Sequence, residues 1–159
     1  PSGPPARLLH GGGQTRHSWR RTAQHLANAG CYAVTFDARG HGDSSWVEDG
    51  EYGETAMVQD LACVICAIGA VNPVLIGASL GGITSLVAVG NKVVDAAALI
   101  LADVAHVTAT DGFERVRAFM TRHAHGFASL KEAAEAITIY RGESRPEGSH
   151  RGLAKNVGL

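Results

Sequence analysis

Short apolar segments alternate with longer segments of helical periodicity along the first hundred residues, and this alternation restricts the fold more than any other feature. The expected strands are residues 6–9, 31–36, 74–76 and 96–102. The expected helices are residues 18–28, residues 54–68 and a third that follows Gly77, with Trp19, Ala23, Leu26 and Ala27, then Met57, Leu61, Val64, Ile65 and Ile68, then Ile83, Leu86 and Val87 each on one helix face. Strand–helix–strand repeats predict a parallel sheet with right-handed crossovers. The fully apolar strands, including 96–102, are expected to be buried on both faces.

The character of the chain changes after Asp111. Residues 113–122 and 130–140 predict two amphipathic helices with no strand between them, and the tail from Arg141 to Leu159 carries little signal. We therefore expect an α/β core over residues 1–105, followed over residues 106–159 by the start of a helical cap and a tail.

Composition excludes several classes of partner. The 159 residues hold 14 Lys plus Arg and 15 Asp plus Glu, a net charge of −1, without a block of like charge. A nucleic-acid or membrane-surface protein is expected to be more basic. The longest strongly apolar run, residues 96–102, is far shorter than the roughly 18 residues that a membrane span needs. We expect neither a nucleic-acid nor a membrane partner, and the sequence leaves the oligomeric state open.

Cysteine usage favours a reducing compartment, and we expect a cytoplasmic location. Cys31, Cys63 and Cys66 are too few and odd in number for a disulfide framework. Cys63 and Cys66 are expected to be buried core thiols, because no further zinc ligands lie nearby at suitable spacing. Since the first residue is Pro1 rather than Met, a preceding signal peptide stays an open alternative.

The segment Gly77-Ala78-Ser79-Leu80-Gly81 matches the G-x-S-x-G pattern. It lies between an expected strand and an expected helix, where a nucleophilic serine stands on a sharp turn at the carboxyl edge of the sheet. Flanking glycines remove side chains that would clash in such a turn. The alternative is a glycine-rich turn without chemistry. The context favours Ser79 as a nucleophile.

A second glycine-rich segment, His10-Gly11-Gly12-Gly13, also follows an expected strand. Its amides can approach a ligand without obstruction from side chains, as in an oxyanion hole. A flexible loop or a phosphate cradle is the alternative, but the lysine of a phosphate-binding loop and the G-x-G-x-x-G pattern of a dinucleotide site are both absent. We expect the amides of Leu80 and Gly12 to be the two oxyanion donors.

The chain resembles the α/β-hydrolase superfamily. The segments LLHGGGQTRHSW, FDARGHGDSSW, LIGASLGG and LILADVAH occur in the order of that family, at intervals that fit its third to sixth strands. The likeness implies a three-layer fold with a mainly parallel sheet and a helical cap. It is greatest to the lid-bearing esterases, lactonases and cofactor-free haloperoxidase-like enzymes. Relatives that open epoxides use an Asp nucleophile, so Ser79 argues against that activity.

The resemblance also implies features that this sequence lacks. In the family the acid and then the His base follow the serine, usually after the seventh and eighth strands. The chain is therefore expected to be the middle of a larger domain, without its catalytic His and with exposed sheet edges that favour instability or association. Asp103, after the fourth expected strand, is the candidate acid, with a plain strand-ending role as the alternative. None of the eight His residues is a strong candidate for the base, and the polar loop with Asp37, Arg39 and Asp43 is expected to be structural.

These patterns together predict a serine hydrolase that cleaves a small carboxylic ester, lactone or related acyl substrate through an acyl-enzyme on Ser79. No metal or organic cofactor is implied. The alternatives are a catalytically incomplete binding protein or inactive fragment of the same fold, and a haloperoxidase-like perhydrolase.

Overall fold

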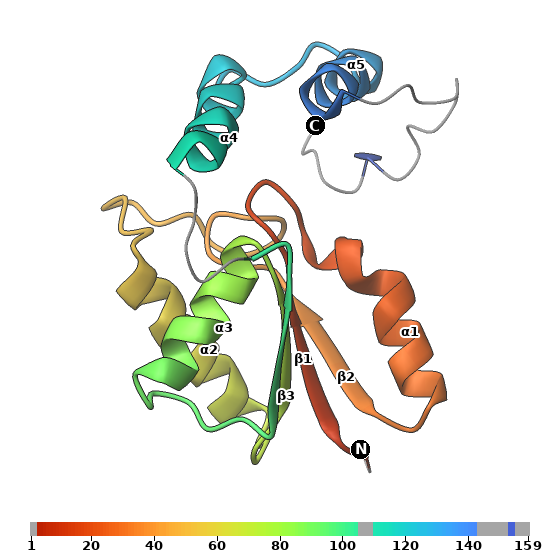
Figure 1. Ribbon diagram of the computed structural model, residues 1–159, viewed down its shortest axis with the longest axis vertical. Helices are drawn as coiled ribbons and strands as arrows, with labels where there is room; N and C mark the ends of the chain where they lie inside the picture. The colour runs from red at the N-terminus through yellow and green to blue at the C-terminus, as the bar shows by residue number, and fades with distance from the viewer. Residues whose placement is uncertain (1–2, 105–109, 143–152, 155–159) are drawn as a thin grey trace. The chain divides into compact units, whose positions relative to one another are not determined.

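The computed structural model describes residues 3–104, 110–142 and 153–154, and the chain divides into two units, Pro1–Val104 and Ala105–Leu159 (Figure 1). The first unit contains, in chain order, β1 (Pro5–Leu9), the 3-10 helix η1 (Arg16–Trp19), α1 (Arg20–Asn28), β2 (Tyr32–Phe36), α2 (Glu54–Ala67), β3 (Val74–Ala78), α3 (Leu80–Gly90) and β4 (Ala98–Ala102). The second contains α4 (Thr110–Arg122) and α5 (Leu130–Arg141). No helix in the described ranges is both long and apolar enough to span a bilayer.

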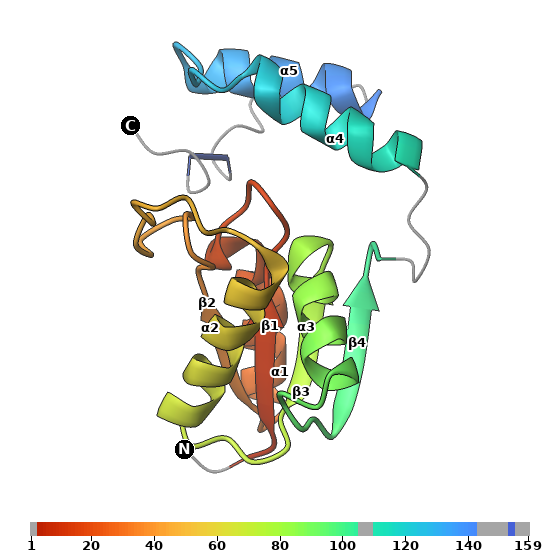
Figure 2. The ribbon, with the colours of Figure 1, turned by 90° about the vertical axis from the view of Figure 1, so that its left-hand side faces the viewer.

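The four strands form one parallel sheet in the order β2-β1-β3-β4. Helix α1 lies on one face of this sheet, and α2 and α3 lie on the other (Figures 1 and 2). This confirms the predicted three-layer α/β architecture. Because all strands run the same way, the loops that follow β1, β2, β3 and β4 meet at one carboxyl edge.

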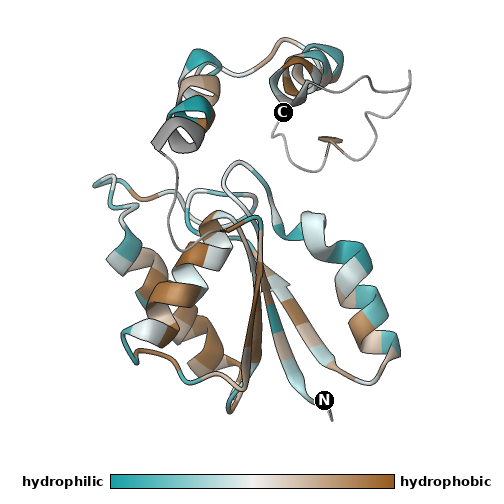
Figure 3. Ribbon diagram, viewed as in Figure 1, coloured by the Kyte–Doolittle hydropathy of each residue, from teal (hydrophilic) through white to brown (hydrophobic). Residues whose placement is uncertain are grey.

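The hydrophobic core lies between the sheet and the helix pair α2–α3. Leu9 and Leu75 point from the strands toward Leu61 and Ile65 of α2 and Ala88 of α3, and all five side chains are buried. Figure 3 shows the difference between the two faces: α2 and α3 are largely hydrophobic, whereas α1 is mostly polar. Helix α1 contains no fully buried residue, so the sheet gains most of its apolar stabilisation from the α2–α3 side.

The fully buried residues of helix α3 are its small ones. Ile83 is 37% exposed, whereas Gly81, Ser85 and Ala88 are buried. Small residues on the inner side let the helix axis approach the sheet closely. Of the face expected from Ile83, Leu86 and Val87, Val87 packs against the core, whereas Ile83 lies outside the packing side.

Strand β4 was expected to be buried, and this expectation is wrong. Ile100 is 50% exposed and Leu101 is 37% exposed. β4 is an edge strand that pairs only with β3 in the described sheet, so its side chains lack neighbours on one flank. Apolar composition alone did not indicate where along the sheet the strand lies.

The expectation of two buried thiols on α2 is also wrong. Cys63 and Cys66 are both exposed. The inward side of this helix is formed by Met57, Leu61 and Ile65, and the two cysteines lie outside that stripe. The helical period therefore predicts the buried side of α2 correctly, and the two cysteines are exposed because they lie off that side.

A charged residue lies in the middle of β1. Arg7 is fully buried, and its Nη1 donates hydrogen bonds to the carbonyl oxygens of Ala6 (3.1 Å) and Tyr32 (3.3 Å). The guanidinium carbon lies 5.2 Å from the centre of the Tyr32 ring, within the range of a cation–π contact. Burial lowers the pKa of Arg7. The ring and the two carbonyls compensate part of the cost of desolvating this charge.

Local hydrogen bonds and a left-handed glycine mark the two ends of α5 in the second unit. Ser129 caps the start of α5, since its Oγ accepts a hydrogen bond from the Glu132 amide at 3.1 Å. Gly142 ends the helix in the left-handed conformation, with φ 66°. Ala133 and Ala134 are the only described residues of this unit that are fully buried.

Candidate active site

Ser79 occupies a sharp turn between β3 and α3. Its backbone has φ 44° and ψ −113°, a conformation that L-residues rarely adopt. Such strain persists only where the surrounding structure enforces it, and it is common at functional sites. The side chain is exposed at the carboxyl edge of the sheet, where the G-x-S-x-G pattern predicted it.

Three glycines around Ser79 are enforced by close packing. A Cβ on Gly77 would lie 2.4 Å from the Gly81 oxygen, and one on Gly81 would lie 2.5 Å from the Leu9 Cβ. A Cβ on Gly82 would lie 2.5 Å from Cγ2 of Val104. The turn packs closely against β1, α3 and the residues after β4, and only glycine fits at positions 77, 81 and 82.

Backbone hydrogen bonds occupy the amides on both sides of Leu80. The Ser79 N–H donates to the Ala102 oxygen at 3.0 Å, and the Gly81 N–H donates to the His10 oxygen at 3.2 Å. Leu80 is the first residue of α3, so its N–H has no partner within the helix. Among the described residues the Leu80 N–H has no hydrogen-bond partner, and it lies at the positive end of the helix dipole, where it can bind an anion.

The glycine loop after β1 lies beside this elbow. A Cβ on Gly11 would lie 3.5 Å from the Ser79 Cβ. The Gly11 N–H donates to Gln14 Oε1 at 3.3 Å, and the Gly13 N–H donates to His41 Nε2 at 3.2 Å. Among the described residues, the Gly12 N–H has no hydrogen-bond partner. The Gly12 N–H is therefore available to a ligand, and its role as an oxyanion donor stays a prediction.

Two histidines hold this loop in place. His10 is buried; its Nδ1 donates to the Gly11 oxygen at 2.8 Å, and its Nε2 accepts from the Ala38 amide at 3.0 Å. His41 uses the same tautomer, donating from Nδ1 to the Arg39 oxygen at 3.0 Å. Burial lowers the pKa of His10, which favours the neutral ring. Because both nitrogens of each ring bind backbone groups, neither histidine can serve as the base for Ser79.

A buried carboxylate anchors the loops that follow β1 and β2. The Asp37 side chain is fully buried and forms an ion pair with the Arg16 guanidinium. It also accepts hydrogen bonds from the amides of Arg16 (2.6 Å) and Asp43 (3.2 Å). Burial alone would raise the pKa of Asp37, but these amide bonds and the nearby guanidinium lower it overall. The same Arg16 also binds the exposed Asp43 carboxylate at 2.5 Å.

Arg39 is used in a second structural contact. Its Nε and Nη2 bind the two oxygens of Asp60 on α2 at 2.5 and 2.7 Å. Asp37, Arg39 and Asp43 are thus all engaged within the protein. The sequence did not identify Arg16 as the common partner of Asp37 and Asp43, because 21 residues separate Arg16 from Asp37 and no local pattern links them.

Asp103, the candidate acid, lies directly after β4. Its φ is 56°, so it shares with Ser79 the uncommon left-handed half of the backbone map. Ala78 and Ala102 are register partners in the sheet, and Ser79 and Asp103 are the residues that follow them. The Asp103 side chain is exposed. The structure therefore places Asp103 and Ser79 at neighbouring strand ends.

Within the described residues no group of three or more His, Cys, Asp and Glu side chains could hold a metal ion. A cavity of about 20 Å³ lies beneath the elbow, lined in part by His10, Leu80 and Thr84. It has the size of a single water molecule. His106 and His150 lie outside the described residues.

The parallel sheet, the strained serine turn and the adjacent glycine loop define the α/β hydrolase class. The model of the alpha/beta hydrolase fold family matches residues 8–134, and the chain belongs to this family.

Among curated relatives, protein phosphatase methylesterase 1 of Mus musculus is 33% identical over 138 residues, covering 84% of this chain and 36% of that protein. Esterase Rv0045c of Mycobacterium tuberculosis is 36% identical over 85 residues, covering 54% of this chain and 28% of the esterase. The chain therefore spans about a third of the length of the curated relatives it matches. A solved α/β hydrolase from Novosphingobium aromaticivorans superimposes with a TM-score of 0.71 at 30% identity, over 87% of this chain and 48% of that one.

Proposed function

We propose that this chain carries the nucleophile and the oxyanion hole of a serine hydrolase that cleaves a small carboxylic ester. The observation that carries the proposal is the exposed Ser79 in a strained turn beside the glycine loop, with the Leu80 and Gly12 amides lacking partners among the described residues. The names of the relatives, an esterase and a methylesterase, favour an ester over a lactone or a thioester.

In the proposed reaction the Ser79 Oγ attacks the carbonyl carbon of the ester, and its proton passes to a histidine outside the described residues. The negative charge that develops on the carbonyl oxygen is stabilised by the N–H groups of Leu80 and Gly12. Loss of one such donor costs about 2.7–4 kcal/mol of transition-state stabilisation. The C–O bond to the alcohol then breaks, the alcohol leaves with the transferred proton, and water hydrolyses the acyl-enzyme.

Asp103 is proposed as the acid that orients the histidine. Its place next to Ser79 at the carboxyl edge supports this role. An exposed carboxylate there is also compatible with the imidazolium that forms during the reaction.

A fluorophosphonate probe applied to the full-length protein tests the nucleophile. We expect covalent labelling at Ser79, complete loss of labelling in Ser79→Ala, and undiminished labelling in Ser45→Ala. Ser45 is the matched control, because it is exposed on the same unit but lies outside the elbow. Labelling that persists in Ser79→Ala would reject the assignment, and a folded protein without any labelling would favour a non-catalytic binding protein.

A further inference from the structure

The helix pair α4–α5 of the second unit carries an open groove lined by residues of both helices. Its volume is about 410 Å³, within the range of small-molecule sites. The lining includes the cationic or titratable side chains Arg115, Arg122 and His123 and the large apolar or aromatic side chains Phe119, Ile139 and Tyr140. The groove thus combines positive charge with an aromatic surface.

The aromatic surface is continuous across the two helices. The rings of Phe119 and Tyr140 lie 4.5 Å apart between centroids and join α4 to α5. His123 lies 5.1 Å from Phe119 and 4.6 Å from Phe127, stacked on the latter. Flat rings at these separations offer an offset-stacking partner to another planar ring. Ile139, which is 81% exposed, adds an aliphatic surface to the lining.

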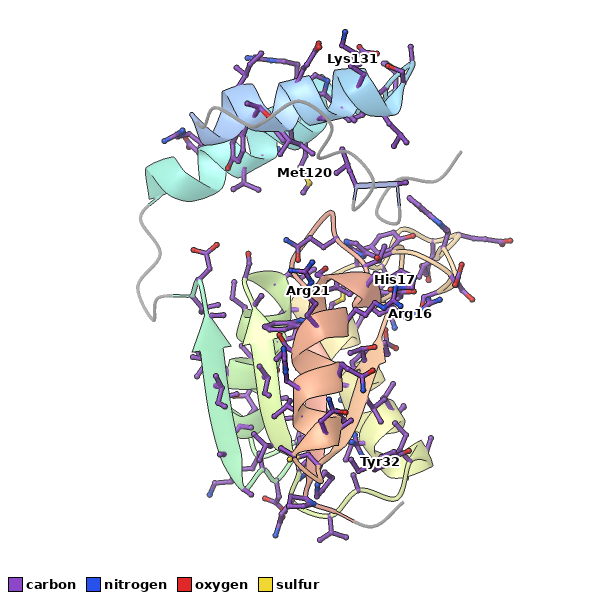
Figure 4. All side chains as sticks on the ribbon, turned by 90° about the vertical axis from the view of Figure 1, so that its right-hand side faces the viewer. Arg16, His17, Arg21, Tyr32, Met120 and Lys131 are labelled. Atoms are coloured by element: carbon purple, nitrogen blue, oxygen red, sulfur yellow. The ribbon has the colours of Figure 1, made fainter. Side chains whose placement is uncertain are left out.

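The positive charge of the groove is not neutralised within the described part of the unit. Arg115 and Arg122 form no ion pair with any described side chain, and they are two helical turns apart on α4. The only ion pair in this part of the chain joins Lys131 and Glu135 of α5, and neither of these residues lines the groove. Figure 4 shows Lys131 pointing to the opposite side of the helix pair from Met120. An anion is therefore the charge that complements this surface.

We propose that the α4–α5 groove binds an amphipathic carboxylate whose apolar part is an aryl ring. The carboxylate pairs with the guanidinium groups of Arg115 and Arg122, which can donate paired N–H bonds to it. The aryl part packs on Phe119, Tyr140 and Ile139. Binding in this groove needs no hydrolysis by Ser79.

Calorimetric titration of the folded protein with 2-naphthoate tests the proposal, with 2-naphthamide as the uncharged ligand of the same shape. We expect saturable binding of the carboxylate and binding of the amide that is about tenfold weaker or more, since a charge-assisted hydrogen bond is worth about one tenfold step in affinity. Added salt should weaken the carboxylate complex, because the guanidinium groups are exposed.

Variants locate the site. Arg122→Gln and Arg115→Gln should each weaken 2-naphthoate binding about tenfold. Arg117→Gln is the matched control: it removes the same charge from the same helix, but Arg117 does not line the groove. It should leave the affinity within about twofold. Ile139→Ser should weaken both ligands to a similar degree, because its exposed side chain contributes apolar contact without holding the helices together.

Binding must also survive in Ser79→Ala, which separates this proposal from the hydrolase assignment. Equal affinity for 2-naphthoate and 2-naphthamide would overturn the proposal. So would an equal loss of affinity in Arg117→Gln and Arg122→Gln, or the absence of saturable binding to protein whose circular dichroism shows intact helices.

Discussion

The two units of the chain are held together in different ways. In Pro1–Val104, a buried core lies on one face of the sheet, and the carboxyl edge is fixed by close backbone packing around Gly77, Gly81 and Gly82. In Ala105–Leu159, the described helices bury only Ala133 and Ala134, and ring contacts and helix caps provide the visible stabilisation.

The difference shows where each unit tolerates change. A strained serine backbone needs tightly packed surroundings, because strain persists only when neighbouring contacts enforce it. A ligand groove between two helices can be built from exposed side chains on a less tightly packed frame. Substitutions should therefore lower the free energy of unfolding strongly at the carboxyl edge of the first unit and only slightly in the second unit.

The largest effect is expected for Gly81→Ala. Its Cβ would lie 2.5 Å from Leu9 Cβ and 2.7 Å from the His10 oxygen, and both are parts of β1 or its exit that cannot move independently. We expect a loss of about 3 kcal/mol in the free energy of unfolding, measured by urea denaturation. Gly90→Ala on the same helix is the control, because no atom lies within 4 Å of its added Cβ. It should be neutral or stabilising by about 0.5 kcal/mol. An equal change in the free energy of unfolding for Gly81→Ala and Gly90→Ala would show that close packing around Gly81 does not restrict this position.

The second effect concerns the two carboxylates that share Arg16. Asp37→Asn leaves a cation without its buried partner and should cost about 2–3 kcal/mol of unfolding free energy. Asp43 is 83% exposed, so Asp43→Asn should cost less than about 1 kcal/mol. Similar losses for both variants would show that the burial of Asp37 adds nothing to the strength of the pair.

The same carboxylate predicts a pH dependence. The pKa of Asp37 is lower in the folded protein than its ordinary value. Its contribution is therefore fully present above the ordinary pKa and is lost as the pH falls through the lowered folded value. Urea denaturation from neutral pH down to about pH 3 should show a steeper decline in the natural protein than in Asp37→Asn. Parallel curves would contradict the assigned shift.

The smallest effect is expected in the second unit. Ser129→Ala removes the oxygen that accepts from the Glu132 amide and should destabilise the start of α5 by about 1 kcal/mol. Ser129→Asp should restore the cap, because a carboxylate there accepts the same hydrogen bond. Hydrogen exchange at the amides of α5 measures both. Protection in the first unit should stay unchanged, and a global loss of protection in Ser129→Ala would mean that the two units unfold together.

Much of the fold could be predicted from the sequence, because its signals are local. In the part of the chain that the structure describes, periodicity placed the four strands and four helices within a few residues of their observed bounds, although the first helix begins as the 3-10 turn η1. For α3 it predicted only a helix after Gly77. The serine turn was predictable because glycine is needed wherever backbones approach closely, and Gly77 and Gly81 mark such positions.

Burial and partnership could not be predicted in the same way. Cys63, Cys66 and Ile100 are apolar or weakly polar residues in apolar segments, yet all three are exposed. Arg7 is charged and fully buried. Burial depends on what covers a residue, and the residues that cover it come from other parts of the chain.

The sequence by itself determined the order of strands and helices, the parallel direction of the sheet and the position of Ser79 at its carboxyl edge, since each of these follows from the spacing of neighbouring residues. The tertiary structure alone decided which groups bind the neighbouring amides. His41, 28 residues away in the chain, accepts from the Gly13 amide, and Gln14 accepts from that of Gly11, whereas the Gly12 and Leu80 amides have no partner among the described residues. Hydrogen-bond partners are selected by proximity in space, so they are set only when the loops after β1, β2 and β3 meet.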